Sequence, residues 1–286
     1  MAGLGRSHKQ EVVKLLKQRK TQVKFSTLWQ AIYEHFEIGF IDNKKLIFSL
    51  LDRETLRQSA IKEWGFDPRT GLPEGTRTGV AYYSTDDKLA TENPNDNYLL
   101  IKTAQGDIPC IGVKKLPSGC SLRISLEQLD FSTIREIIII ENQDCYDLWH
   151  QFNLPQALKA TLTFYRGHDV QAKAIHHLID QLLPETMITI FADYDPAGLK
   201  IACTTPKSSH VLIPTLSPEL MAKSYPDDYY KQHDQAAYLD NSLKKNKLDG
   251  WQDIWLNIKQ NHYSIKQQHM LAYNALLYTV KRKSIS

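Results

Sequence analysis

The stretches IREIIIIE at residues 134–141 and TMITIFADYDPAG at residues 186–198 decide the fold. Each contains an unbroken apolar run that leads into acidic residues, which predicts a strand buried on both faces of a sheet. A similar run, ATLTFYRG at 160–167, lies between them, and SHVLIPTL at 209–216 follows. Helical patterns separate these runs, the clearest being VQAKAIHHLIDQLL at 170–183. The alternation of strand and helix predicts an α/β domain with a parallel central sheet.

The sequence on either side of this core follows different patterns. Helical patterns at 8–18, 26–36 and about 43–64 precede a turn-rich stretch, which predicts a helical or winged-helix-like region over residues 1–97. Short strands separated by turns are predicted within a connector at 98–133, in NYLLIKTA, DIPCIGVKKL and CSLRIS. The α/β domain is expected to occupy residues 134–286 together with C-terminal helices. The last of these is predicted over 267–280, and the helices offer a surface for a homodimer.

Bulk composition is that of an ordinary globular protein. The 286 residues are 42% hydrophobic and 23% charged, with a formal net charge of +3. No apolar run approaches the roughly 18 residues of a membrane span, and the charged N-terminus lacks the apolar core of a secretory signal. The four cysteines have no metal-binding spacing and are expected to be reduced. These features predict a cytoplasmic protein that does not act in a membrane.

The N-terminal segment carries a local excess of positive charge. Between Arg6 and Lys24 there are seven Lys or Arg residues and a single acid, Glu11. Clustered cations neutralise phosphates and release counterions, which is the main source of sequence-independent DNA affinity. A solvated helix face has the same composition, so both interpretations stay open. The candidate DNA contacts are Lys14, Lys17, Arg19 and Lys20.

Acidic residues follow two of the predicted core strands. The functional edge of an open parallel sheet lies outside the carboxyl ends of its strands, so Glu141, Asp193 and Asp195 are expected to meet there. Three carboxylates at one edge repel one another unless a cation lies between them, and oxygen ligands favour Mg²⁺ or Mn²⁺. Residues i and i+2 of an extended segment point the same way, so both aspartates can face one ion. Taken singly, each acid also fits an ordinary strand exit to solvent.

Several neighbours of these acids are candidate phosphate contacts. Gly198 permits a tight turn or the close approach of a phosphate at the start of the next helix. Arg166, His168 and Lys200 flank the acids and can contact phosphate, although each is equally well a surface cation. Asp144 either joins a second metal site or caps the helix that follows Glu141.

In this combination the chain resembles the Toprim family, which includes topoisomerases, DnaG-type primases and several nucleases. The family signature is a Glu after the first strand and an Asp-x-Asp after a later one. The segment FADYDPAGLKIA at 191–202 is most similar to the A subunits of type IIB topoisomerases and to the JetD or MksG nuclease subunit of Wadjet-type, condensin-like plasmid-defence complexes. The resemblance covers about residues 134–215. It implies that Glu141 is the family acid, Gly167 the central glycine, and Asp193 and Asp195 the metal-binding pair.

The resemblance implies a Mg²⁺-dependent DNA endonuclease that is the cutting subunit of a prokaryotic defence complex, with a condensin-like (SMC-like) ATPase as partner. Glu141 would be a metal ligand or a general base. No P-loop occurs in the sequence, so the chain itself is not expected to hydrolyse ATP by that route. The alternatives are a non-catalytic DNA-binding or regulatory module and a tyrosine-dependent, topoisomerase-like transesterase.

Two sequence features bear on these alternatives. A transesterase needs a tyrosine nucleophile on a DNA-binding helix, and the doublet Tyr82–Tyr83 lies on no recognisable recognition helix, which favours hydrolysis. Nuclease relatives often have a Gln–Glu pair in the C-terminal segment. Here Gln267–Gln268 has no acid, and this departure predicts reduced metal occupancy.

Overall fold

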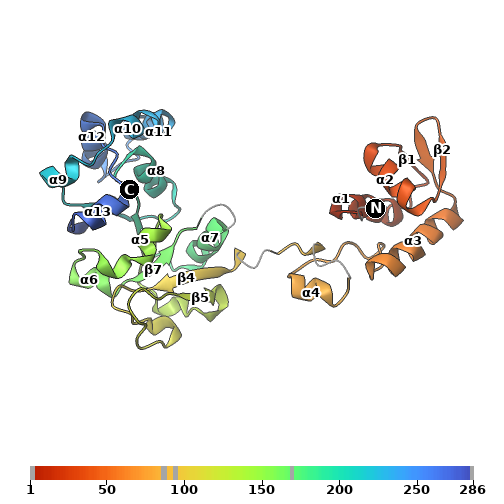
Figure 1. Cartoon of the computed structure of the whole chain (residues 1–286), viewed down its shortest axis with the longest axis horizontal. Coiled ribbons are helices and arrows are strands. Elements are labelled where there is room, and N and C mark those ends of the chain that lie inside the picture. Colours follow the sequence, from red (N-terminus) through yellow and green to blue (C-terminus); the bar gives the residue numbers. More distant parts are fainter. Residues whose placement is uncertain (1–3, 85–88, 93–95, 168–170, 284–286) are drawn as a thin grey trace. The chain divides into compact units, whose positions relative to one another are not determined.

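A computed structural model describes residues 4–84, 89–92, 96–167 and 171–283. The chain forms two compact units, residues 1–94 and residues 95–286 (Figure 1). None of the helices in the described ranges has the length and apolar character needed to cross a membrane.

Unit 1 combines helices with a small antiparallel sheet in the order β1–β3–β2. Its core contains Trp29, Leu46, Leu56 and Trp64, all nearly inaccessible to solvent. The predicted helices are present, but the third begins later than expected, because residues 45–47 pair as a strand and Ser49 forms a capping box that starts the helix. The elements are α1 (Arg6–Lys17), β1 (Gln22–Lys24), α2 (Thr27–Phe36), β2 (Phe40–Asp42), β3 (Lys45–Ile47), α3 (Leu50–Trp64) and α4 (Arg77–Ala81).

Unit 2 is a mixed α/β structure built on a seven-stranded sheet in the order β10–β9–β8–β6–β7–β4–β5. The four central strands, β9, β8, β6 and β7, are parallel as predicted, whereas β10, β4 and β5 pair antiparallel at the edges. The sheet predicted to be parallel is therefore parallel in its four central strands and mixed as a whole. The strands are β4 (Tyr98–Lys102), β5 (Leu122–Ser125), β6 (Glu136–Ile140), β7 (Leu162–Tyr165), β8 (Met187–Phe191), β9 (His210–Pro214) and β10 (Leu277–Lys281).

Three further expectations are corrected in unit 2. Residues 107–116 form no strand; they make a 3₁₀ turn closed by a bridge between Ile108 and Val113. The helix predicted over 267–280 stops at Ala272, because Asn274 adopts a left-handed conformation and the chain then enters β10 beside β9. Since β4 and β5 belong to the same sheet as β6–β10, residues 98–133 are part of the α/β unit and not a separate connector.

The centre of the sheet determines where a site can form. β6 and β8 are neighbours, and all of their residues except the first of each, Glu136 and Met187, are buried. The chain leaves β6 towards β7 and leaves β8 towards β9, in opposite directions along the sheet. The connections therefore diverge at the carboxyl ends of β6 and β8, which is the place where open α/β sheets usually bind ligands.

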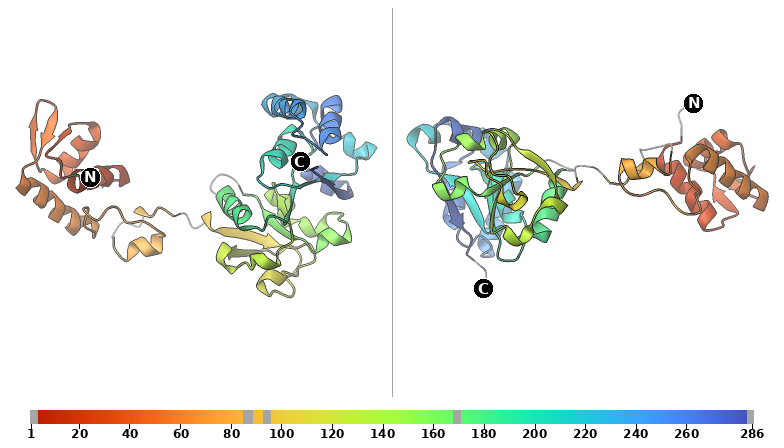
Figure 2. Two further views of the ribbon diagram at one scale, coloured as in Figure 1. Left: turned by 180° about the vertical axis from the view of Figure 1, so that it is seen from behind. Right: turned by 90° about the horizontal axis from the view of Figure 1, so that it is seen from below.

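The helices of unit 2 connect the strands and then extend beyond them. Helices α11 and α12 pack against α8, and α13 packs against α5, so the last third of the chain returns to the carboxyl edge of the sheet (Figure 2). The helices are α5 (Gln143–Asp147), α6 (Gln156–Lys159), α7 (Gln171–Gln181), α8 (Pro196–Thr204), α9 (Pro218–Met221), α10 (Pro226–Tyr230), α11 (His233–Lys244), α12 (Gln252–Asn261) and α13 (Gln267–Ala272).

Candidate functional site

Glu141 and Asp193 lie side by side at the carboxyl ends of β6 and β8. The backbone N–H of Glu141 donates to the carbonyl oxygen of Phe191 (3.0 Å), and the backbone N–H of Asp193 donates to the Glu141 carboxylate. Burial and repulsion by Asp193 raise the pKa of Glu141, while the nearby cation Arg166 opposes that rise. Burial and repulsion by Asp195 likewise raise the pKa of Asp193. The two predicted acids thus form a close pair whose negative charges are unfavourable together.

Asp195 has a different environment from the other two acids. It is 1% exposed, and it is the N-cap of α8, where its Oδ1 atom accepts the N–H of Gly198 (2.9 Å). Its Oδ2 atom accepts from Gln232 Nε2 (2.8 Å), Ser264 Oγ (3.2 Å) and Lys266 Nζ (3.3 Å). Both oxygens are therefore occupied by protein donors, which suits a structural role better than direct metal ligation.

Lys266 places a permanent cation between the two aspartates. Its Nζ atom is 3.4 Å from Asp193 Oδ2, 3.3 Å from Asp195 Oδ2 and 3.9 Å from Asp228 Oδ2. Burial by itself would lower the pKa of Lys266, but the two aspartates together raise it above the ordinary lysine value. The ammonium group therefore stays charged and offsets part of the repulsion at this edge.

The C-terminal segment supplies this lysine through backbone pairing with the Asp-x-Asp loop. Tyr194 and Ile265 form an antiparallel bridge, with N–H to O=C distances of 2.9 and 3.2 Å. The backbone N–H of Gln267 donates to Asp193 Oδ1 (2.8 Å), and its side-chain Oε1 accepts the N–H of Asn142 (3.2 Å). Ser264 and Lys266 were missed by the sequence reasoning, since nothing in SIKQQ distinguishes them from surface residues. Within this segment, the family resemblance points to Gln267 but not to Ser264 or Lys266.

Gly198 is required by packing at the start of α8. A Cβ atom at this position would overlap the carbonyl oxygen of Asp193. It would also lie 3.0 Å from the backbone N and C atoms of Asp193. Because backbone atoms cannot move aside as a flexible side chain can, only glycine fits without displacing the Asp193 loop. The close approach predicted for this glycine therefore exists, but its partner is the protein's own backbone.

We expect Gly198→Ala to destabilise unit 2 by about 2–3 kcal/mol or more, since the added methyl group cannot be accommodated without moving Asp193. Chemical denaturation monitored by tryptophan fluorescence measures this loss. Ala197→Gly, one position earlier in α8, is the matched control and should cost about 1 kcal/mol or less. Equal stability of Gly198→Ala and the wild type would show that the loop relaxes freely.

The other predicted contacts are distributed more widely. Arg166 and Gly167 follow β7, and Gly167 has a φ of 75°. Lys200 is turned towards α11, with its Nζ atom 5.4 Å from the centre of the Tyr238 ring. His168 lies outside the described residues. Asp144 is exposed and does not cap α5, because Asn142 Oδ1 accepts the N–H of Cys145 (3.1 Å) in that role.

The side chains predicted to contact DNA in unit 1 are all exposed. Lys14, Lys17, Arg19 and Lys20 lie along the last turns of α1 and just beyond it, and Lys14 pairs with Glu11 (2.8 Å). Tyr82 and Tyr83 are 82% and 69% exposed and follow the short helix α4.

Two of the three predicted carboxylates are suited to holding a divalent cation. Within the described ranges, no group of three or more His, Cys, Asp and Glu side chains is arranged to hold a metal ion. Mg²⁺, however, is commonly held by one or two carboxylates, with water and substrate phosphate completing its shell. Glu141 and Asp193 meet that smaller requirement, because both are partly accessible and mutually repulsive. Asp195 does not, since its oxygens accept four protein donors.

Comparison with family models places most of unit 2 in a known family. The model of a family described as "Domain of unknown function (DUF7281)" matches residues 96–279, which is well over half of the chain and nearly all of unit 2. None of the curated proteins matches the chain.

Proposed function

The chain belongs to this DUF7281 family, and from the chemistry of the site we propose that it is a metal-dependent phosphodiesterase that cleaves DNA by hydrolysis. The observation that carries the proposal is the pair Glu141 and Asp193 at the diverging ends of β6 and β8, with the Lys266 ammonium beside it. Two carboxylates and a fixed cation at one edge of the sheet suit a substrate that brings negative charge and shares a divalent ion.

Each side chain has a distinct part in this proposal. Glu141 and Asp193 would hold one Mg²⁺ or Mn²⁺, which when bound polarises the scissile phosphate and stabilises the leaving oxygen. Lys266 would donate to a non-bridging phosphate oxygen and neutralise part of its charge. Asp195 would position Lys266 and the start of α8 without touching the substrate. Its four hydrogen bonds to protein donors support this positioning role. This revises the hypothesis that all three acids ligate the metal.

The Toprim identity of unit 2 and the winged-helix character of unit 1 belong to the same proposal. Support comes from the order in which Glu141, Gly167 and the Asp193–Asp195 pair follow successive strands of one parallel group. In unit 1 the support is the β2–β3 hairpin beside three helices. The resemblance to nuclease subunits of condensin-like complexes further supports a partner ATPase that directs cleavage, because base-reading contacts are not evident in the chain.

A second candidate is a DNA-binding or regulatory module without catalysis. The observation that favours it is again Lys266, whose ammonium lies between Asp193 and Asp195 where a metal ion would otherwise neutralise them. Binding of Mn²⁺ separates the two candidates. A phosphodiesterase should bind Mn²⁺ through Glu141 and Asp193, as detected by electron paramagnetic resonance, whereas a module neutralised by Lys266 should not.

The cleavage assay uses supercoiled plasmid with Mg²⁺ or Mn²⁺, and with EDTA as the metal-free control. We expect nicked and linear products with free ends, and no protein left attached to DNA after denaturation. Tyr82→Phe and Tyr83→Phe should cleave at the wild-type rate, because hydrolysis needs no tyrosine nucleophile. A covalent protein–DNA adduct that disappears in either variant would overturn the hydrolytic proposal.

A further inference from the structure

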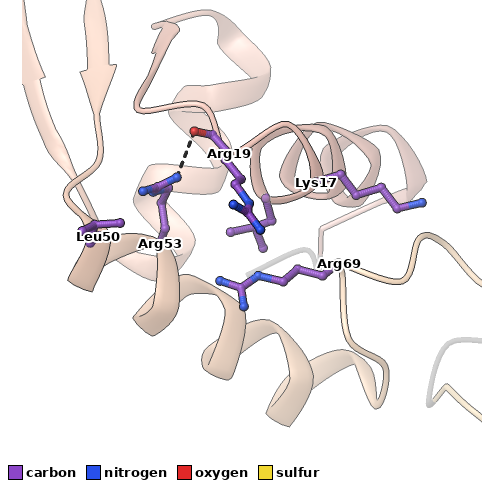
Figure 3. A pocket seen from close by; sticks show the side chains of 6 residues that line it. Lys17, Arg19, Leu50, Arg53 and Arg69 are labelled. Atoms are coloured by element: carbon purple, nitrogen blue, oxygen red, sulfur yellow. Dashed lines mark hydrogen bonds between the residues drawn. The ribbon is translucent and has the colours of Figure 1, made fainter.

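Unit 1 contains a pocket of about 450 Å³ that the proposed cleavage site does not use. It lies between the end of α1 and the start of α3, and Figure 3 shows the side chains around it. Two apolar side chains and four cations line it: Leu16, Leu50, Lys17, Arg19, Arg53 and Arg69. Its volume is within the range of roughly 300–1,000 Å³ that is usual for small-molecule sites, so it can admit a phosphate with its attached sugar.

The cations of this pocket are short of anionic partners. In the part of the chain that the structure describes, the side chains of Lys17 and Arg19 have no hydrogen bond or ion pair, and the buried Nε atom of Arg53 has no partner. Arg53 is held by a bond from its Nη1 atom to the carbonyl oxygen of Arg19 (2.9 Å). Arg69, by contrast, has a carboxylate partner, Glu54, at 3.0 Å.

Two other cations of unit 1 have carboxylate partners, in contrast to Lys17, Arg19 and Arg53. Arg57 binds both Asp67 and Glu54, and Lys14 binds Glu11. Like charges gathered without counterions repel one another, and a buried guanidinium N–H without an acceptor is destabilising. An anion in the pocket relieves both penalties.

The end of α1 shapes the pocket, and the charges around it determine the sign of its electrostatic potential. α1 ends where Arg19 takes a left-handed conformation (φ 51°), which turns its side chain out of the helix and into the recess shared with Arg53 and Arg69 (Figure 3). The carboxyl end of α1 contributes roughly half a negative charge. Three cations without a carboxylate partner outweigh that contribution, so the pocket attracts anions.

We propose that this pocket binds a phosphate group of a nucleic-acid strand. The lining cations suit the oxygens of a phosphate, and a contact to phosphate carries no sequence information. Lys14 and Lys20 extend the positive charge along the end of α1, where they would meet the neighbouring phosphates. The inference rests on the proposed function only in taking DNA as the substrate.

The test measures DNA binding by the full chain in EDTA, so that no cleavage is needed. Fluorescence anisotropy of a labelled duplex is recorded over a range of salt concentrations for the wild type, Arg19→Gln and Arg53→Gln. We expect each variant to bind DNA about tenfold more weakly. The slope of the logarithm of the binding constant against the logarithm of the salt concentration should decrease by about the value of one phosphate contact. Arg19→Gln is the cleaner variant, because among the described residues the wild-type side chain makes no hydrogen bond or ion pair, whereas Arg53 donates to the carbonyl oxygen of Arg19.

Lys62→Gln is the matched control, an exposed cation on α3 away from the pocket, and should bind like the wild type. Inorganic phosphate and a nucleoside monophosphate serve as competitors. Displacement only at millimolar concentrations supports a strand phosphate, whereas displacement at micromolar concentrations that Arg19→Gln abolishes assigns the pocket to a free phosphate ester. Wild-type affinity in both arginine variants, or an equal loss in Lys62→Gln, overturns the proposal. None of these outcomes depends on whether Glu141 and Asp193 bind metal.

Discussion

Asp193→Asn is expected to reduce DNA cleavage by about 10³-fold or more while leaving the protein folded. The asparagine keeps the oxygen that accepts the Gln267 N–H (2.8 Å in the wild type), so the loop retains its conformation. What is lost is the negative charge that, with Glu141, would hold the divalent ion. Cleavage of supercoiled plasmid and binding of Mn²⁺ should therefore decline together.

The stability of this variant gives an independent check. Burial and Asp195 raise the pKa of Asp193 in the folded state, so its stabilising contribution is present below the unfolded pKa and is lost as the pH rises through the folded pKa. At neutral pH the ionised aspartate therefore costs stability, and neutral asparagine removes that cost. We expect Asp193→Asn to melt at the wild-type temperature or higher.

Asp144→Asn is the control for Asp193→Asn, because Asp144 is an exposed acid close in sequence to Glu141. It should retain wild-type cleavage and Mn²⁺ binding. If Asp193→Asn cleaves normally, or if it loses activity only because it unfolds, the metal-dependent proposal fails.

Lys266→Met is expected to lower the free energy of unfolding by about 2–3 kcal/mol in metal-free buffer. Removing one member of a buried ion pair typically costs about 3–5 kcal/mol, and the partial exposure of Lys266 (32%) reduces that figure through solvent screening. Without the ammonium, Asp195 remains buried with a smaller set of donors, and its repulsion of Asp193 is less well compensated.

Divalent ions should restore much of this loss. A cation that binds the folded protein alone stabilises it in proportion to the logarithm of its concentration over its Kd. We therefore expect Mg²⁺ or Mn²⁺ to raise the melting temperature of Lys266→Met more than that of the wild type, because the variant offers an extra uncompensated charge. Cleavage should stay about 10²-fold below wild type, since the donor to the phosphate oxygen is gone.

Lys231→Met serves as the control for Lys266→Met. Lys231 pairs with Asp228 at 3.0 Å but is 72% exposed, so its loss should change the stability little and should not respond to metal. A Lys266→Met protein that melts like the wild type and ignores divalent ions would show that Lys266 is an ordinary surface cation.

The local sequence pattern was sufficient to predict the central strands of unit 2. The apolar runs before Glu141 and Asp193 are long enough and uniform enough to predict β6 and β8, and their parallel pairing follows from the helices between them. The same reasoning failed at the edges. A run such as that from Gln267 to Val280 is compatible with either helix or strand, and the turn at Asn274 with pairing to β9 decided between them.

The sequence by itself thus determined which acids stand at the carboxyl edge of the sheet, because strand ends and the residues that follow them are adjacent in the chain. Only the tertiary structure decided what surrounds those acids. Lys266 is 71 positions from Asp195 in sequence, and Gln232 is 37 positions away, so no local periodicity connects them. Their contacts depend on the bridge between Tyr194 and Ile265 and on the packing of α11 against α8. Hydrogen bonding and burial, which act through space, therefore distinguish an acid that can bind a metal from one that holds a helix and a lysine in place.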